Sequence, residues 1–141
     1  MEEYDTHQVV APASSSWGDG GFHAVWLDPS NAWMYPELHA AEQKMVFSAR
    51  HFSEGAPLSE SEERCLRQLA RELLLAQSSD WAFLIRSATA RDYAVRRVRE
   101  HLDRFRRLHA QLHAGLIDSA LLENCEERDN LFPRLNWRIY A

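Results

Sequence analysis

Trp17 and Trp26 lie nine residues apart, and Gly18, Gly20 and Gly21 stand between them. Glycine tolerates positive φ angles, so the backbone can turn sharply in this stretch. Two large aromatic rings on a bent loop are either buried against another part of the protein or exposed as platforms for a flat ligand. A sugar is one such ligand, because its apolar ring face stacks on an indole while its hydroxyl groups need polar partners at the ring edge.

Polar side chains that suit sugar hydroxyl groups accompany these tryptophans. Asp19 and His23 lie in the same stretch, and Ser79, Asp80 and Trp81 repeat the combination farther along the chain. Both groups are therefore candidate sugar-binding residues. The residue types alone favour the alternative, in which the tryptophans are buried anchors between the loop and the rest of the domain.

The histidines include one pair with metal-ligand spacing. His109 and His113 are four residues apart, which places them on one face of a helix. The residues between them, Ala110, Gln111 and Leu112, lack the glutamate of an HExxH motif. The sequence therefore predicts no metal site and no cofactor. A metal-dependent hydrolase that uses this histidine pair is a competing hypothesis.

The sequence contains no recognisable catalytic motif. It has no GxSxG nucleophile elbow. Asp19 and Asp80 are possible acids, but the distance between two carboxylates decides their chemistry, and spacing in the sequence does not give that distance. We therefore assign no catalytic residue from the sequence.

Composition and charge indicate a single globular domain of 141 residues with a net charge of −5. The negative charge argues against a nucleic-acid partner. The acidic N-terminus is no signal peptide, and the longest apolar runs are too short to cross a membrane. Cys65 and Cys125 form no CxxC and are expected to be reduced core residues. These features predict a cytoplasmic protein without a membrane partner.

The N-terminal 31 residues show no sustained hydrophobic period and are expected to form a long irregular loop. The first helix follows Pro29-Ser30-Asn31, with Ser30 or Asn31 as its cap, and ends at Gly55-Ala56-Pro57. Its apolar stripe consists of Met34, Leu38, Ala41, Met45, Ala49 and Phe52.

The second helix begins at a capping box made by Ser59 and Glu62. Its core stripe is Leu66, Leu69, Ala70, Leu73 and Leu74. Its expected solvent face is Arg64, Arg67, Gln68, Arg71 and Glu72. Whether this helix continues through the polar residues 77–81 is left open, because polar groups at core depth would need partners.

The third helix is expected to open at Thr89, with Asp92 completing a capping box, and to stop at Gly115. Its inner stripe is Ala94, Val98, His101, Leu102, Phe105, Leu108 and Leu112. Asp118 caps a short fourth helix that runs to about Arg128. The predicted fold class is therefore all-α, an antiparallel bundle of about four helices with a long irregular N-terminal loop segment.

Longer stretches of the chain resemble a known family. They are Ser15-Ser16-Trp17-Gly18, Gly21-Phe22-His23, Val25-Trp26-Leu27, residues 33–39, residues 70–85, residues 89–94 and residues 129–138. Together they are similar to the C-terminal helical domain of the 1,4-α-glucan branching enzymes of glycoside hydrolase family fifty-seven. The similarity extends over nearly the whole chain.

The resemblance implies an activity that belongs to a larger enzyme. In this family a (β/α) barrel carries a glutamate nucleophile and an aspartate acid/base, and the retaining reaction passes through a covalent glucosyl-enzyme to an α-1,6 branch. The helical domain closes over the barrel's cleft. By this resemblance Trp17 and Trp26 line the α-glucan site, and the segment from Ser78 to Trp81, with Ser79 and Asp80, lies near it.

The barrel has no counterpart in this sequence. The resemblance therefore implies that residues 1–31 would join and pack on a catalytic barrel, and that residues 32–141 form the helical bundle domain. The expected partners are an α-glucan, such as amylose or glycogen, and a barrel supplied in cis or in trans. The isolated chain is expected to be inactive. The competing hypothesis is a non-catalytic helical module that binds another protein.

Overall fold

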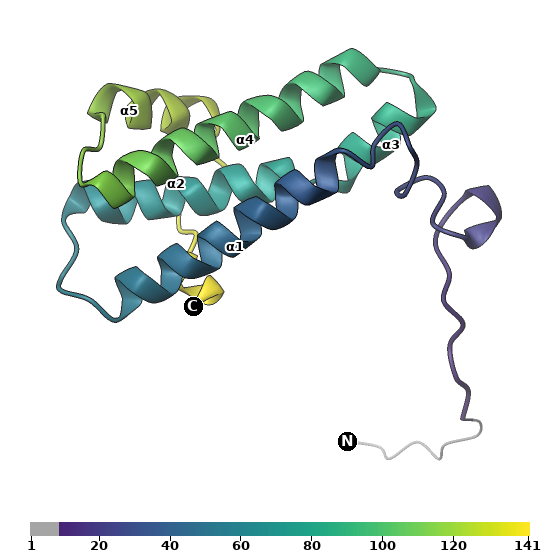
Figure 1. The fold of residues 1–141 in the computed structure, drawn as a ribbon, viewed down its shortest axis with the longest axis horizontal. Helices are drawn as coiled ribbons and strands as arrows, with labels where there is room; N and C mark the ends of the chain where they lie inside the picture. The colour runs from purple at the N-terminus through teal and green to yellow at the C-terminus, as the bar shows by residue number, and fades with distance from the viewer. Residues whose placement is uncertain (1–8) are drawn as a thin grey trace.

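The computed structural model describes residues 9–141, so the first eight residues of the predicted loop segment 1–31 lie outside the described part of the chain. The described residues form α-helices and short 3₁₀ helices without a strand, which confirms the all-α class (Figure 1). The α-helices are α1 (Met34–Ser53), α2 (Glu60–Ala76), α3 (Ser79–Ser87), α4 (Arg91–Ala114) and α5 (Ser119–Arg128). The 3₁₀ helices are η1 (Asp19–Gly21) and η2 (Trp137–Tyr140).

Helix α2 lies at the centre of the bundle and packs against α1, α4, α5 and η2. The inner stripe predicted for residues 94–112 is confirmed, because every one of its members is buried on α4. Phe105 and Leu108 of that stripe are fully buried, as are Leu66, Leu69 and Leu73 on α2. Burial of such apolar side chains at helical spacing is the main driving force for the bundle.

Three of the predicted helix signals occur as expected. Glu62 N–H donates to Ser59 Oγ (3.3 Å) and Ser59 N–H donates to Glu62 Oε2 (2.8 Å), which completes the capping box of α2. Asp118 accepts from two backbone N–H groups at the start of α5. Gly115 ends α4 with a φ of 67°, a left-handed conformation that glycine adopts without steric cost.

The predicted caps of α1 and α4 are wrong. Helix α1 follows Trp33 and has no side-chain cap, because Asn31 Oδ1 instead accepts from Asp28 N–H within the preceding turn. Helix α4 follows Ala90, also without a side-chain cap. The hydroxyl group of Thr89 bonds that of Ser87 instead.

The polar residues 77–81 form a break, which answers the open question about the second helix. Helix α2 ends at Ala76 and α3 begins at Ser79. The indole Nε1 of Trp81 donates to the Leu75 carbonyl oxygen (2.7 Å), and the amide of Gln77 donates to Glu42 (2.6 Å). The side chains therefore gain partners that a continuous helix would not offer them.

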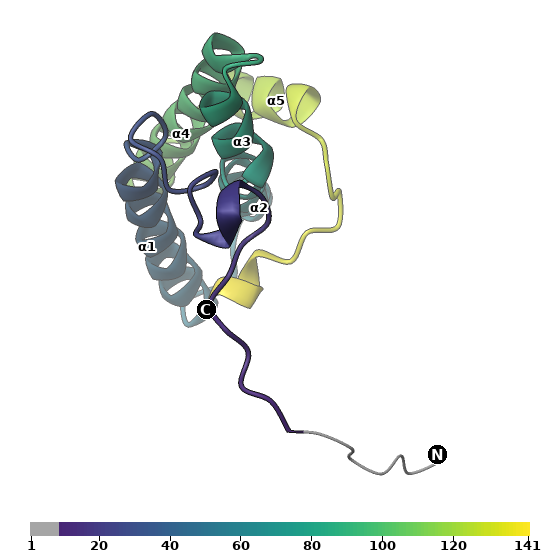
Figure 2. The same cartoon turned by 90° about the vertical axis from the view of Figure 1, so that its right-hand side faces the viewer.

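The predicted solvent face of α2 is partly wrong, because Gln68, Arg71 and Glu72 are buried. The chain after α5 returns along this side of α2 and covers it (Figure 2). Gln68 Nε2 donates to the Cys125 carbonyl oxygen (3.2 Å), and the Arg71 guanidinium donates to that of Leu131. The two remaining members, Arg64 and Arg67, stay partly exposed as expected.

Trp137 ends this returning segment and is fully buried, with its Nε1 donating to Glu63 Oε1 (2.9 Å). Cys65 and Cys125 are free and buried, as predicted. Within residues 9–141, no helix is long and apolar enough to span a membrane.

Candidate functional site

The irregular segment before α1 is attached to α3 at the end of the bundle (Figure 1). Asn31 makes the attachment and is fully buried. Its Nδ2 donates to the carbonyl oxygens of Val25 (3.0 Å) and Ala82 (3.2 Å), and its Oδ1 accepts from Asp28 N–H (3.0 Å). One short side chain therefore holds two turns of the loop against α3.

Gly18, Gly20 and Gly21 all have positive φ angles, of 75°, 75° and 82°, which confirms the sharp bend expected here. The turn is closed by a bond from Ser16 N–H to the Gly21 carbonyl oxygen (2.9 Å). A Cβ atom at Gly18 would lie 3.4 Å from Val25 Cγ2. The glycines therefore permit both the turn and its close approach to the following segment.

Trp17, Trp26 and Phe83 form an exposed aromatic group, which we call the aromatic shelf. The Trp17 ring lies 6.0 Å from the Trp26 ring in an edge-to-face arrangement and 6.0 Å from the Phe83 ring, centroid to centroid. Trp17 is 67% exposed, whereas Trp26 is partly buried against the core. The structure therefore separates the two tryptophans: Trp26 anchors the loop and Trp17 presents its ring to solvent.

Charged residues border the aromatic shelf. Arg86 of α3 lies 3.4 Å from Asp19 and 2.9 Å from Asp28, nitrogen to oxygen. Hydrogen bonds from the Ser30 hydroxyl and backbone lower the pKa of Asp28, and the positive charge of Arg86 adds to this effect. Asp19, Phe83 and Arg86 also line a shallow pocket of about 250 Å³. An apolar ring face and charged hydrogen-bonding groups thus lie side by side.

His23 belongs to the same loop, as the sequence suggested. Its backbone N–H donates to Ser16 Oγ (2.7 Å), and its Nε2 lies 3.3 Å from Ser14 Oγ. Its φ of 64° is unusual for a residue with a side chain. The fold of the loop thus fixes the position of the imidazole near the glycine turn.

Ser79, Asp80 and Trp81 form the first turn of α3 and do not face one direction. Successive helix residues turn by about 100°, so Ser79 shares the Phe83 face while Trp81 points to the opposite side. The Trp81 ring packs edge-on against Tyr93, with centroids 6.1 Å apart. Asp80 is exposed and accepts from the Ser78 hydroxyl (2.6 Å).

Phe83 and Arg86 are site residues that the sequence reading missed. They lie four and seven residues after Ser79, so a helical projection of residues 79–87 would have grouped all three. The sequence alone leaves open whether residues 77–81 continue the preceding helix, so it does not establish that these three residues share a face.

Comparison with known proteins identifies the family of a domain with this fold and this loop. Residues 37–140 match the family model described as 1,4-alpha-glucan branching enzyme, C-terminal. The chain belongs to this family of branching-enzyme C-terminal domains. A curated 1,4-alpha-glucan branching enzyme of Thermococcus kodakarensis is 39% identical in a 138-residue alignment that covers 94% of this chain and 20% of that protein. A probable branching enzyme of Mycobacterium tuberculosis is 32% identical over 133 residues, 88% of this chain and 24% of that protein.

Solved structures of related enzymes contain the same fold. The GH57-type branching enzyme of Pyrococcus horikoshii aligns with a TM-score of 0.88 at 36% identity, covering 98% of this chain and 26% of that one. An alpha-amylase of Thermotoga maritima aligns with a TM-score of 0.79 at 36% identity, covering 98% of this chain and 24% of that one. This branching-enzyme domain thus spans about a fifth to a quarter of its relatives' length.

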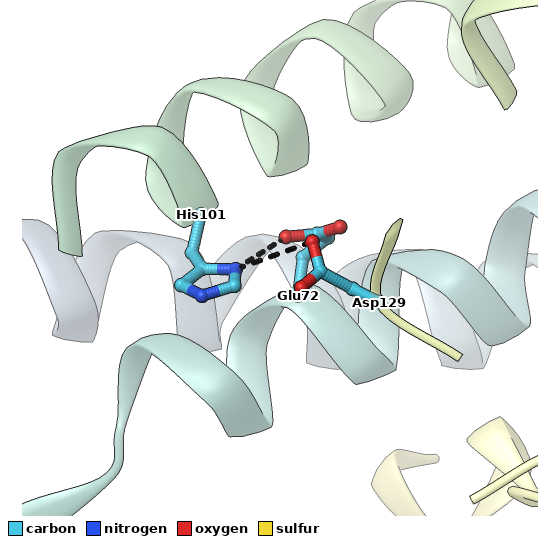
Figure 3. Close-up of side chains that lie close together, drawn as sticks. All are labelled: Glu72, His101 and Asp129. Carbon is cyan, nitrogen blue, oxygen red and sulfur yellow. Dashed lines mark hydrogen bonds and ion pairs between the residues drawn. The ribbon is translucent and has the colours of Figure 1, made fainter. Parts of the chain in front are cut away.

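Away from the shelf, the domain also contains a buried cluster of Glu72, His101 and Asp129 (Figure 3). His101 Nδ1 lies 2.7 Å from Glu72 Oε2 and 4.0 Å from Asp129 Oδ2. Three such ligands can hold a metal ion, but Arg104 already lies 3.1 Å from Glu72 and 2.9 Å from Asp129. A second guanidinium, that of Arg97, contacts His101 and Asp129. We interpret this cluster as a charge-balanced structural network that joins α2, α4 and the end of α5.

Proposed function

We propose that the chain is the α-glucan-binding C-terminal domain of a 1,4-α-glucan branching enzyme, and that Trp17 is its stacking platform. The observation that carries the proposal is the exposure of Trp17, at 67%, on a loop whose conformation is fixed. Exposing a rigidly held indole to water is unfavourable unless it has a ligand or a partner. A pyranose ring face fits this chemistry.

The surrounding residues provide the remaining parts of the proposed site. Trp26 supports the Trp17 ring through its edge-to-face contact, and His23 offers a hydrogen bond from the same loop. Ser79 and Asp80 are exposed at the start of α3, where they offer further groups to sugar hydroxyls. Trp81 contributes by positioning, because its indole ties the first turn of α3 to the end of α2.

Catalysis is proposed to belong to another domain. The carboxylate of Asp19 forms an ion pair with Arg86, and we assign it no catalytic role. We assign the catalytic carboxylates to a (β/α) barrel present in cis or in trans, and residues 1–31 to the segment that joins and packs on it. The shelf then covers the glucan and excludes water, which favours transfer of the glucosyl group over hydrolysis in glycogen-like polymers.

A second candidate function is a protein-docking module without glucan affinity. The observation that favours it is a set of apolar side chains on the same segment, with Phe22 at 82% and Leu27 at 64% exposure. Exposed apolar side chains beside Trp17 are typical of a surface that another protein covers. In this hypothesis the shelf binds only protein.

Affinity electrophoresis of the chain in gels with and without amylose or glycogen separates the two functions. The glucan-binding proposal expects retardation by either polymer, whereas the docking proposal expects unchanged mobility at every polymer concentration. An iodine-stain assay on amylose then tests the division of labour. We expect no branching by the chain alone and branching when a barrel is added; branching by the chain alone would contradict the assignment of catalysis to the barrel.

A further inference from the structure

A group of aromatic and histidine side chains gathers where the later part of α1 meets the end of α4. The histidine pair of α4 is joined there by His51 of α1. The ring centroids of His109 and His113 are 4.5 Å apart, and those of His51 and His113 are 5.9 Å apart. Phe47 and Phe52 flank the rings, with centroids 5.5 Å and 5.4 Å from that of His113.

Two of the three ring separations are close to that of imidazoles around one metal ion. With Zn–N bonds of about 2.0–2.1 Å and tetrahedral angles, the centroids of two zinc-bound imidazoles lie about 5 Å apart. The two measured separations lie on either side of this value. We propose that His51, His109 and His113 form a binding site for a divalent transition metal ion of the Zn²⁺ class.

The hydrogen bond of His113 to Ser48 leaves the other ring nitrogen with a free lone pair. Ser48 Oγ donates its proton to the Lys44 carbonyl oxygen (2.9 Å), so it must accept from His113 Nε2, which lies 2.9 Å away. Nε2 therefore carries the hydrogen, and the lone pair of the neutral ring is on Nδ1. A histidine that ligates through one nitrogen while its other N–H is held by an oxygen is the usual arrangement in metal sites.

His109 gives the second, independent observation. Its Nε2 is buried and has no hydrogen-bond partner among the residues that the structure describes. A buried polar atom without a partner is unfavourable, and a metal ion would satisfy it. Burial, together with the nearby His113 and Lys44, lowers the pKa of His109 to about 4.

Two features set the conditions for binding. Within residues 9–141, the three rings do not yet bring their nitrogen atoms within 4.8 Å of one another. His51 is exposed, so rotation of its side chain can close the site while His113 keeps its bond to Ser48. Lys44 opposes a cation here, but it is also exposed and its long side chain can move into solvent.

Zn²⁺ titration of the full chain, without an added histidine tag, by isothermal titration calorimetry tests the proposal. We expect one ion per chain, with His51→Ala and His113→Ala each weakening binding by about tenfold or more. His39→Ala is the matched control, because His39 is also exposed on α1 but lies about 18 Å along the helix from His51. Circular dichroism of each variant confirms that it remains folded.

Nitrogen-15 NMR of the histidine rings identifies the ligands directly. The proposal expects Zn²⁺ to shift the ring nitrogens of His51, His109 and His113, with Nδ1 as the ligating atom of His113. Absence of saturable binding, shifts confined to other histidines, or an equal loss of affinity in His39→Ala would each overturn it.

Discussion

Asn31→Ala is expected to release the loop that carries Trp17 while leaving the bundle folded. The substitution removes bonds to the Val25 and Ala82 carbonyl oxygens and to Asp28 N–H. At about 1 kcal/mol for each bond, the free energy of opening the loop would decrease by about 3 kcal/mol. Ala82 lies within α3, whose own hydrogen bonds also use its carbonyl group, so we expect about 2 kcal/mol.

Hydrogen exchange measured by NMR detects this decrease at individual loop amides. The amides of Trp26 and Leu27 bond the His23 carbonyl oxygen, and that of Ala32 bonds Asp28, so all three are protected only while the loop is closed. A loss of about 2 kcal/mol corresponds to exchange about 30-fold faster at these amides. Amides of α2, such as that of Leu69, are expected to exchange at the rate of the unmodified chain.

Ser30→Ala is the matched control for this prediction. It removes a hydroxyl bond to Asp28 in the same turn, but leaves the attachment to α3 intact. We expect the loss of this partly exposed bond to lower the free energy of opening the loop by less than about 1 kcal/mol. Equal exchange rates in Asn31→Ala and the unmodified chain, or equally faster exchange throughout α2, would refute the argument that the Asn31 side chain helps to hold the loop against α3.

Three further predictions concern the interior of the bundle. Glu72→Gln removes one of two buried carboxylates and leaves Asp129 alone to balance Arg97 and Arg104, so it should reduce the free energy of unfolding by about 3–5 kcal/mol in urea denaturation. Folding lowers the pKa of His109 from 6.5 to about 4, so the unfolded chain takes up a proton first as the pH is lowered. The free energy of unfolding should therefore decrease as the pH falls from about 6.5 to about 4. His109→Gln should flatten that fall. Burial raises the pKa of Cys65 to about 12 and of Cys125 to about 11, so neither thiol should react with Ellman's reagent at pH 8 until urea is added.

Each of these predictions has a result that contradicts it. Glu60→Gln changes an exposed carboxylate on α2, and a loss as large as that of Glu72→Gln would remove the special role of the buried network. His39→Gln should leave the pH dependence unchanged, so an identical slope for His39→Gln and His109→Gln would count against the assignment to His109. Rapid thiol reaction in the folded chain would show that the core opens readily.

Signals local to one helix were readable from the sequence. The capping box of Ser59 and Glu62, the stop at Gly115 and the inner stripe of α4 each depend on residues within a few positions of one another. The sharp turn at the glycines was predictable for the same reason.

Features set by distant segments were not readable in this way. Gln68, Arg71 and Glu72 look like a solvent face in the sequence, but α4, α5 and the chain after α5 cover them. Leu131, which accepts from Arg71, lies sixty positions later in the chain. The break before α3 depends on Trp81 bonding the Leu75 carbonyl oxygen, and the shelf depends on Phe83 facing Trp17. In each case a contact between separate elements overrides the local pattern.

The central claim is that Trp17 binds α-glucan. Its most direct test compares Trp17→Ala with Phe47→Ala. Phe47 is 60% exposed, against 67% for Trp17, and lies on α1 beside His113, away from the shelf. In amylose affinity electrophoresis we expect Trp17→Ala to lose most of the retardation and Phe47→Ala to keep it. Retardation that is unchanged in Trp17→Ala, or reduced equally in both variants, would contradict the claim.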